Sequence, residues 1–208
     1  MKLYYSPAAC SLAPHIALEE SRLPYTTKRV DLKTHKVADG SDYYAINPKG
    51  YVPLLELDDG ARLSEVAVIL QYIADRKPGT LAPDFGGMDR YRHMEWLNFI
   101  ATEIHKQFAP LWHPAPAETH EAQRAKLATR FEFVAKALGT QPYLTGKQFT
   151  IADAYLFTLL RWAGPLKVDI SRRPVLTQYV ERVAARPAVQ AVLVAEGLTK
   201  PKHEATPA

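Results

Sequence analysis

A loop-rich segment, Lys77 to Gly87, divides this sequence into two unlike parts and constrains its fold more than any other feature. The segment holds two prolines and three glycines, a composition typical of a linker or loop. Before it, short runs of β-forming residues alternate with helical patterns, whereas the pattern after it is helical almost throughout. We therefore predict an α/β domain over residues 1–77, a linker over 78–87 and an all-helical domain over 88–208.

The first part begins with a predicted strand, helix and strand. Lys2 to Tyr5 is a run of β-forming residues, and Leu12 to Glu20 carries apolar residues at helical spacing. Pro14 is tolerated in the first helical turn if Ser11 caps the helix, because first-turn amides have no intrahelical acceptor. Thr26 to Leu32 has the pattern of a second strand, so a right-handed βαβ unit is expected.

A hairpin and a helix complete the first part. Pro53 to Leu57 and Arg62 to Ser64 are separated by Asp58-Asp59-Gly60, and Asp-Gly between two apolar runs is a strong hairpin signal. The apolar residues that follow repeat at helical spacing and stop before Pro78; they are Val66, Ile69, Leu70 and Ile73. The expected order is β-α-β followed by β-β-α.

Apolar residues in the second part repeat every three or four positions, as on the buried face of a helix. The sets are Leu97, Ile100, Ile104 and Phe108; Leu127, Phe131, Val134 and Leu138; and Val175, Tyr179, Val183 and, after Pro187, Val192. Pro114-Ala115-Pro116 separates the first two sets, and the polar tail from Thr199 to Ala208 is expected to be mobile.

Composition and charge limit the class of protein. The net charge is +4 and the pI about 9.1, but Lys and Arg are scattered and form no clustered basic stripe of the kind that nucleic-acid binding usually needs. No apolar run approaches the roughly 20 residues that cross a bilayer, and the first residues lack the apolar core of a secretory signal. We expect a soluble, cytoplasmic protein with no nucleic-acid or membrane partner.

Cys10 is the single cysteine, so neither an intrachain disulfide nor a cysteine-based metal cluster can form. It lies between the first strand and the first helix, at the edge where open α/β sheets place ligands, and amides at a helix start lower a thiol pKa. Ala13 stands where a Cys-x-x-Cys motif needs its second cysteine, so redox chemistry would take a thiol from a small molecule. The alternative is a cysteine that packs as a small apolar side chain.

Two further positions allow a structural and a functional interpretation. A cis Val52–Pro53 bond would expose the Val52 amide and carbonyl to an extended peptide ligand, whereas a trans bond would only open the strand. Glu65 begins a helix, where the helix dipole stabilises a carboxylate, and the same carboxylate can bind a ligand ammonium group.

A polar stripe follows the linker, because Asn98, Thr102 and His105 fall at i, i+4 and i+7 together with Glu95. His105 is then either a solvated surface histidine or a group that moves protons near pH 7 from a cleft between the domains. The other histidines lack the spacing of metal ligands, and we expect no metal.

Thr150 and Asp153 form a predicted capping box at the start of an apolar helix. Because its polar groups are used by backbone amides, we expect stability from it and no catalysis. Four aromatic residues either line a hydrophobic pocket or pack in the core: Phe108, Trp112, Tyr155 and Trp162.

Four segments form a recognisable pattern when they are taken in their order along the chain: Met1 to Leu12 with its cysteine, Asn47 to Pro53, Glu95 to Lys106 and Phe149 to Tyr155. Together they resemble the cytosolic glutathione S-transferases, specifically the bacterial beta class, over Met1 to about Leu198. The resemblance implies a thioredoxin-like glutathione-binding domain, a helical domain with a hydrophobic substrate site, and a homodimer. Glutathione would be the co-substrate, bound close to the subunit interface.

The resemblance also implies roles for residues of the first domain. Cys10 would contact the glutathione sulfur and be able to form a mixed disulfide with it. Val52, before a cis Pro53, would pair with the cysteinyl backbone of glutathione. Glu65 would hold the γ-glutamyl ammonium group, with the Val66 amide near its carboxylate.

The helix after the linker would complete the site, in part from the neighbouring subunit. The implied residues are Asn98, Thr102, Glu103, His105 and Lys106. His105 and Lys106 would lie near the sulfur, and His105 would share the catalytic role with Cys10.

Two positions depart from the family pattern. Val66 stands where many members have a hydroxyl residue, so only its amide is left for the carboxylate. His35 stands where related proteins often have a lysine for the glycyl carboxylate, and it is flanked by Lys33 and Lys36. The sequence does not decide which of the three binds that group.

Three functions are consistent with these observations. The first is an enzyme that lowers the thiol pKa of glutathione and adds the thiolate to a small, mostly apolar electrophile. The second uses Cys10 as a nucleophile for thiol–disulfide transfer, peroxide reduction or reductive dehalogenation through a glutathione mixed disulfide. The third is a non-catalytic ligand-binding protein on the same fold.

Overall fold

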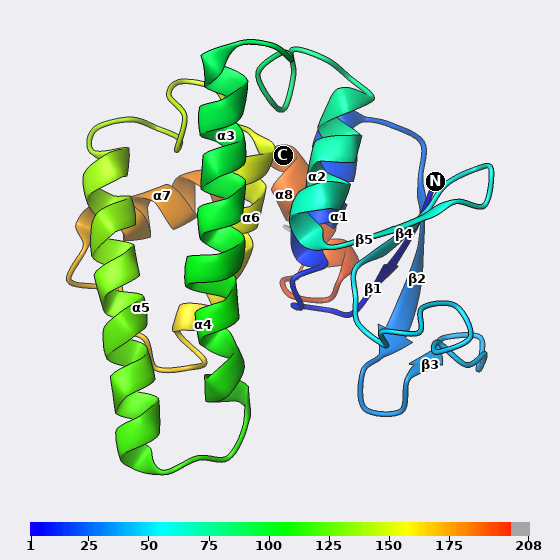
Figure 1. Cartoon of the computed structure of the whole chain (residues 1–208), viewed down its shortest axis with the longest axis horizontal. Coiled ribbons are helices and arrows are strands. Elements are labelled where there is room, and N and C mark those ends of the chain that lie inside the picture. Colours follow the sequence, from blue (N-terminus) through cyan, green and yellow to red (C-terminus); the bar gives the residue numbers. More distant parts are fainter. Residues whose placement is uncertain (201–208) are drawn as a thin grey trace, which may run out of the picture.

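A five-stranded mixed sheet lies in the first part of the chain, in a computed structural model that describes residues 1–200 (Figure 1). The strands are β1 (Lys2–Tyr5), β2 (Thr26–Asp31), β3 (Lys36–Val37), β4 (Leu54–Glu56) and β5 (Arg62–Ser64), in the spatial order β3-β2-β1-β4-β5. β1 is parallel to β2 and antiparallel to β4, and β4 pairs with β5. The expected β-α-β and β-β-α units are confirmed. The two-residue β3 was not expected, because it is too short to show a period.

Two helices connect the sheet to the rest of the protein. α1 (Leu12–Ser21) and α2 (Val66–Asp75) contact each other and lie between the sheet and the later helices (Figure 1). α1 also packs on two helices of the second part, α6 (Ile151–Ala163) and α8 (Pro187–Ala195). Ser11 occupies the N-cap position of α1 as expected, but its side chain makes no capping hydrogen bond. Its hydroxyl donates to the Ser6 carbonyl (3.2 Å) and accepts from the Ser6 amide (3.1 Å).

From Met88 to residue 200 the elements are helical. They are α3 (Met88–Phe99), a π-helical segment η1 (Ile100–His105), α4 (Lys106–Phe108), a 3₁₀ turn η2 (Ala109–Trp112), α5 (Ala117–Leu138), α6, α7 (Pro174–Ala184) and α8. The predicted apolar sets are buried except Val175, whose neighbour Leu176 takes the core position. The expected mobility of the tail from Thr199 to Ala208 stays a prediction, because residues 201–208 lie outside the described residues.

One large core joins the two parts. Side chains of α1 and α2 share it with α3, α5, α6, α7 and α8, whereas a small second cluster covers the other face of the sheet around Tyr4, Val30 and Tyr43. The relative position of sheet and helices is therefore set by apolar packing, whose free energy scales with the buried area. No helix among residues 1–200 is both long and apolar enough to cross a membrane.

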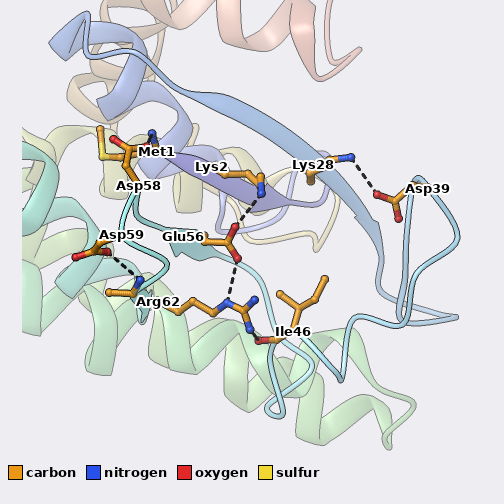
Figure 2. Close-up of polar contacts among 10 residues, drawn as sticks. Met1, Lys2, Lys28, Asp39, Ile46, Glu56, Asp58, Asp59 and Arg62 are labelled. Atoms are coloured by element: carbon orange, nitrogen blue, oxygen red, sulfur yellow. Dashed lines mark hydrogen bonds and ion pairs between the residues drawn. The ribbon is translucent and has the colours of Figure 1, made fainter.

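Charged side chains connect β1, β4 and β5 at one end of these strands (Figure 2). Glu56 on β4 accepts hydrogen bonds from Lys2 on β1 (2.8 Å) and from Arg62 on β5 (3.0 Å). Arg62 also donates to the carbonyl of Ile46 (2.8 Å) and so ties the hairpin to the segment that precedes β4. These contacts hold in register the strands whose opposite ends form the site described next.

Candidate active site

A cavity of about 1120 Å³ lies between the loops of the sheet and the helical part. What we call the sheet wall comprises Ser6–Cys10, Leu32, Asn47, Lys49, Tyr51–Pro53 and Ser64–Val66. What we call the helical wall comprises Ala101, His105, Lys106, Ala109, Trp112, His113, Tyr155 and Trp162. The sequence-predicted residues Cys10, Val52, Pro53, Glu65, Val66, His105 and Lys106 therefore meet in one place.

Cys10 lies in the turn between β1 and α1, two residues before the helix starts. Its thiol is free and donates a hydrogen bond to the Val52 carbonyl (3.3 Å). Burial raises the pKa of the Cys10 thiol to about 12; its own amide and that of Ser11 act in the opposite direction, and the Glu65 carboxylate raises it further. The expected lowering of the pKa by the helix start is therefore wrong. Burial outweighs the amides, and Cys10 is a neutral hydrogen-bond donor.

The helical part holds the loop that carries Cys10. Ala8 has a positive φ of 61°, its amide donates to Glu196 Oε2 (3.0 Å), and its carbonyl accepts from Trp162 Nε1 (2.8 Å). The other oxygen of Glu196 bonds to His15 Nδ1 on α1 (2.8 Å), and both side chains are buried. The loop that carries Cys10 is thus held through both the amide and the carbonyl group of Ala8.

The Val52–Pro53 peptide bond is cis, as expected. The segment before it is held by Asn47, whose side-chain amide donates to the Tyr51 carbonyl (2.7 Å), and by Tyr43, whose hydroxyl donates to the same carbonyl (2.9 Å). Val52 is therefore a fixed backbone position on the sheet wall, next to the sulfur of Cys10.

Glu65 stands immediately before α2 with a positive φ of 72°. Its carboxylate accepts a hydrogen bond from Lys49 Nζ (2.8 Å), and the same ammonium group donates to the Ser64 hydroxyl (3.1 Å). Val66 is the first residue of the helix, and first-turn amides have no intrahelical acceptor, which suits an anion. This corner of the cavity offers a cation, a carboxylate and free amides.

His105 lies on the helical wall and faces the cavity. Its Nδ1 forms a hydrogen bond with the Tyr155 hydroxyl (2.7 Å), and its ring contacts Trp162 edge to face. Burial lowers the pKa of His105 to about 4; Glu65 opposes this shift and Lys106 adds to it. The imidazole is therefore neutral at pH 7, and Lys106 is the neighbouring cation on this wall.

The expected polar stripe is divided by η1. Asn98 and Thr102 are exposed and lie outside the cavity lining, whereas His105 lines it. A π-helical turn bonds residue i to i+5, so residues after it are rotated off the face that α-helical spacing predicts. Thr102 donates to the Asn98 carbonyl (3.0 Å), and Glu103 pairs with Arg130 on α5 (2.8 Å). Roles for Asn98, Thr102 and Glu103 at a neighbouring subunit stay predictions.

The residues named for the glycyl carboxylate do not line the cavity. His35 has a positive φ of 51° and its Nε2 bonds to the Tyr44 hydroxyl (3.2 Å). Lys33 and Lys36 border a separate groove of about 650 Å³, which shares Ser6 and Leu32 with the cavity. The lysine of the sheet wall is Lys49, which the sequence analysis did not single out, although it stands in the recognised Asn47–Pro53 segment.

The aromatic residues divide between wall and core. Trp112, Tyr155 and Trp162 line the cavity, while Phe108 is fully buried behind Trp162 and contacts it edge to face. Small alanines at 101 and 109 leave space beside these rings. The helical wall accordingly combines an aromatic surface, which suits a flat or hydrophobic ligand, with the polar side chains of His105, Lys106 and His113.

The capping box at α6 is confirmed as a structural feature. Asp153 is completely buried and accepts from the Thr150 amide (2.9 Å), the Thr150 hydroxyl (2.8 Å), the Leu144 amide (2.9 Å) and the Tyr179 hydroxyl (2.9 Å). It is not part of the cavity lining. No group of three metal-ligating side chains is brought together among residues 1–200.

Comparison with known proteins gives consistent matches along the chain. The family models for the N-terminal and C-terminal domains of glutathione S-transferase match residues 8–76 and 99–187. Glutathione S-transferase GstA of Escherichia coli O157:H7 is 48% identical over 201 residues, 95% of this chain and all of that protein. Glutathione S-transferase GST-4.5 of Xanthomonas campestris is 41% identical over 207 residues, 95% of this chain and all of that protein.

Solved structures of glutathione S-transferases are also similar to this chain. A ternary complex of BphK, a bacterial glutathione S-transferase, superposes with a TM-score of 0.92 at 50% identity and covers 95% of this chain and all of that one. A sphingomonad glutathione S-transferase complexed with glutathione gives a TM-score of 0.91 at 42% identity, with 96% of this chain and all of that one covered.

Proposed function

The chain belongs to the glutathione S-transferase family, and we propose that its cavity binds glutathione along the sheet wall and a small, mostly apolar electrophile along the helical wall. The relatives at 48% and 41% identity are bacterial, and a bacterial beta-class member is among its structural neighbours. The protein is accordingly an enzyme that uses glutathione as a co-substrate. The observation that carries the assignment of the two walls is their unlike chemistry: the sheet wall offers backbone groups and the Lys49–Glu65 pair, whereas the helical wall presents the rings of Trp112, Tyr155 and Trp162 beside Lys106.

We assign the contacts to glutathione residue by residue. The Val52 backbone would pair with the cysteinyl unit, the Glu65 carboxylate with the γ-glutamyl ammonium group, and the Val66 amide with the adjacent carboxylate. The thiol would then lie next to Cys10, because Cys10 Sγ already contacts the Val52 carbonyl at 3.3 Å. His105 and Lys106 would face the sulfur from the helical wall.

Catalysis would consist of stabilising the glutathione thiolate and presenting it to the electrophile. The neutral Cys10 thiol would turn its single proton from the Val52 carbonyl to the anionic sulfur, and the Lys106 ammonium group favours the same charge. In a substitution on an aryl halide, the thiolate forms the carbon–sulfur bond, halide leaves with the bonding pair, and the thiol proton goes to solvent. The high pKa of Cys10 favours this role over a role as the nucleophile of a redox or dehalogenating reaction.

The remaining assignments rest on the family. We propose a homodimer in which Asn98, Thr102 and Glu103 of a second copy complete the glutathione site. We also propose division into residues 1–77 and 88–208 joined by 78–87, and a detoxifying role in the cytoplasm.

The test compares Cys10→Ala with Cys10→Ser in the conjugation of glutathione to a simple aryl halide. A hydrogen bond to a charged group contributes about 1.5–3 kcal/mol, so we expect kcat/KM to fall at least about tenfold in Cys10→Ala. Cys10→Ser keeps a donor and should stay within about threefold of the wild type, because the remaining groups are unchanged.

Two results would overturn this role of Cys10. Unchanged conjugation in Cys10→Ala, together with a glutathione adduct on wild-type Cys10 that a reducing thiol removes, would support the redox function. Tight binding of hydrophobic dyes with no turnover of any electrophile by the wild type would support a ligand-binding protein.

A further inference from the structure

Lys49 reaches the cavity from a rigid turn. The Asn47 side-chain oxygen accepts the Lys49 amide (3.2 Å), and the Gly50 amide donates to the Asn47 carbonyl (2.8 Å). Gly50 has a φ of +69°, and a side chain there would meet the Tyr44 ring at 2.6 Å. The backbone on both sides of Lys49 is therefore fixed, and only its side chain is free to adjust.

The ammonium group of Lys49 is hydrogen-bonded to Glu65, the carboxylate that the proposed function assigns to the ammonium group of the ligand. Its Nζ lies 2.8 Å from Glu65 Oε1 and 3.1 Å from the Ser64 hydroxyl. The side chains of Lys49 and Glu65 are 54% and 68% exposed, and such an ion pair contributes little to stability. Glu65 can therefore accept a second ammonium group at small cost in free energy.

The charges of this corner match the γ-glutamyl end of glutathione. That end carries an ammonium group and a carboxylate on one carbon atom, so a cation and an anion are needed side by side. The cations on the cavity walls are Lys49 and Lys106, and Lys106 lies on the opposite wall beside His105. Val66 offers only its amide to the carboxylate, so a charged partner is missing unless Lys49 supplies it.

We propose that Lys49 is a specificity-determining residue that binds the α-carboxylate of the γ-glutamyl group, while Glu65 binds its ammonium group. The Lys49–Glu65 pair then opens into an alternating arrangement of four charges with the ligand. This inference rests on the proposed function and extends it. The glycyl carboxylate is the less suitable partner, because it lies at the other end of the tripeptide from the ammonium group that Glu65 holds.

The experiment uses Lys49→Met, which removes the charge and keeps an unbranched side chain. KM is measured for glutathione and for 4-aminobutanoyl-cysteinyl-glycine, which lacks only the α-carboxylate. We expect Lys49→Met to raise KM for glutathione about tenfold, because a charge-assisted hydrogen bond is lost, and to leave KM for the analogue unchanged. Lys49→Arg keeps the charge and should remain within about threefold of the wild type for both.

Lys136→Met is the matched control, since Lys136 is 77% exposed on α5 and away from the cavity. An equal rise in KM for both substrates would overturn the proposal, because Lys49 would then act on Glu65 or on the glycyl end. An unchanged KM for glutathione would overturn it as well. Failure of the proposed function is recognised separately, as absence of glutathione turnover in the wild type. Thermal unfolding of each variant identifies any loss of folding.

Discussion

The two walls of the cavity are built in different ways. The sheet wall is shaped mainly by backbone geometry over short stretches of chain, with positive φ values at Ala8 and Glu65 and a cis bond before Pro53, and the helical part holds it at Ala8. The helical wall consists of side chains whose positions depend on packing between helices, such as His105 against Tyr155 and Trp162. A wall of the first kind suits a ligand of constant structure such as glutathione. In a wall of the second kind, side chains can be substituted, and the substrate that they bind can differ, while the fold stays the same.

The largest expected effect concerns the support of the helical wall. Asp153→Ala removes a buried carboxylate that accepts four hydrogen bonds and leaves their donors unpaired. We expect the free energy of unfolding to fall by about 3–5 kcal/mol and Tm by roughly 6–20 °C. Thermal and urea unfolding measure both quantities.

Glu118→Ala is the matched control for Asp153→Ala, because Glu118 is also acidic and lies in the first turn of a helix but is exposed on α5. It should cost about 1 kcal/mol or less. Equal losses in the two variants would mean that the burial of Asp153 does not stabilise the wall.

The next prediction concerns two histidines of the same helical part. His93 on α3 is fully buried, neither of its ring nitrogens has a hydrogen-bond partner among residues 1–200, and burial lowers its pKa to about 4. Below pH 6.5 the unfolded chain takes up a proton that folded His93 does not, so the free energy of unfolding falls from pH 6.5 towards pH 4, by up to roughly 3 kcal/mol. His105 contributes in the same direction.

His93→Leu should therefore flatten the acid side of the stability profile without altering glutathione turnover at pH 7. Urea unfolding between pH 4 and pH 7 gives the profile. The prediction fails if the wild type and His93→Leu lose stability equally over this range, since the slope would then come from other groups.

The contrast between the sheet wall and the helical wall explains which features of the site can be predicted from the sequence. On the sheet wall the signals are local: Asp59-Gly60 marked the hairpin, Pro53 marked the strand start, and Glu65 stood at a helix start. On the helical wall, spacing assumed a regular α-helix, and η1 moved His105 away from Asn98 and Thr102. One contact of the sheet wall is an exception: the bond from Ala8 to Glu196 joins residues 188 positions apart, and no local pattern indicates it.

Burial was the other property that the sequence did not reveal. Cys10 precedes a helix, so a lowered thiol pKa was predicted, but the desolvation that raises it depends on neighbours from several elements. The orientation of Lys49 is a similar case. The sequence indicates that Lys49 lies in a turn. Its contact with Glu65 depends on the tertiary structure that brings this turn next to the end of β5.

The smallest effect is expected at the charged contacts that connect β1, β4 and β5 (Figure 2). Glu56→Gln weakens the contacts with Lys2 and Arg62, and we expect a loss of about 1 kcal/mol or less, because both partners are partly exposed. The difference from the wild type should shrink in about 1 M salt, which screens these charges. A loss that does not depend on salt would indicate packing and not charge.

The central claim, that each wall binds one substrate, is tested most directly by the two Michaelis constants of Glu65→Gln and Trp112→Ala. Phe133→Ala serves as control, because Phe133 and Trp112 are each 53% exposed but Phe133 lies outside the cavity lining. Glu65→Gln should raise KM for glutathione at least about tenfold and leave KM for the aryl halide within about twofold. Trp112→Ala should do the reverse, with a rise of about fivefold for the aryl halide. If each variant raised both constants equally, the division of the cavity into two substrate walls would be wrong.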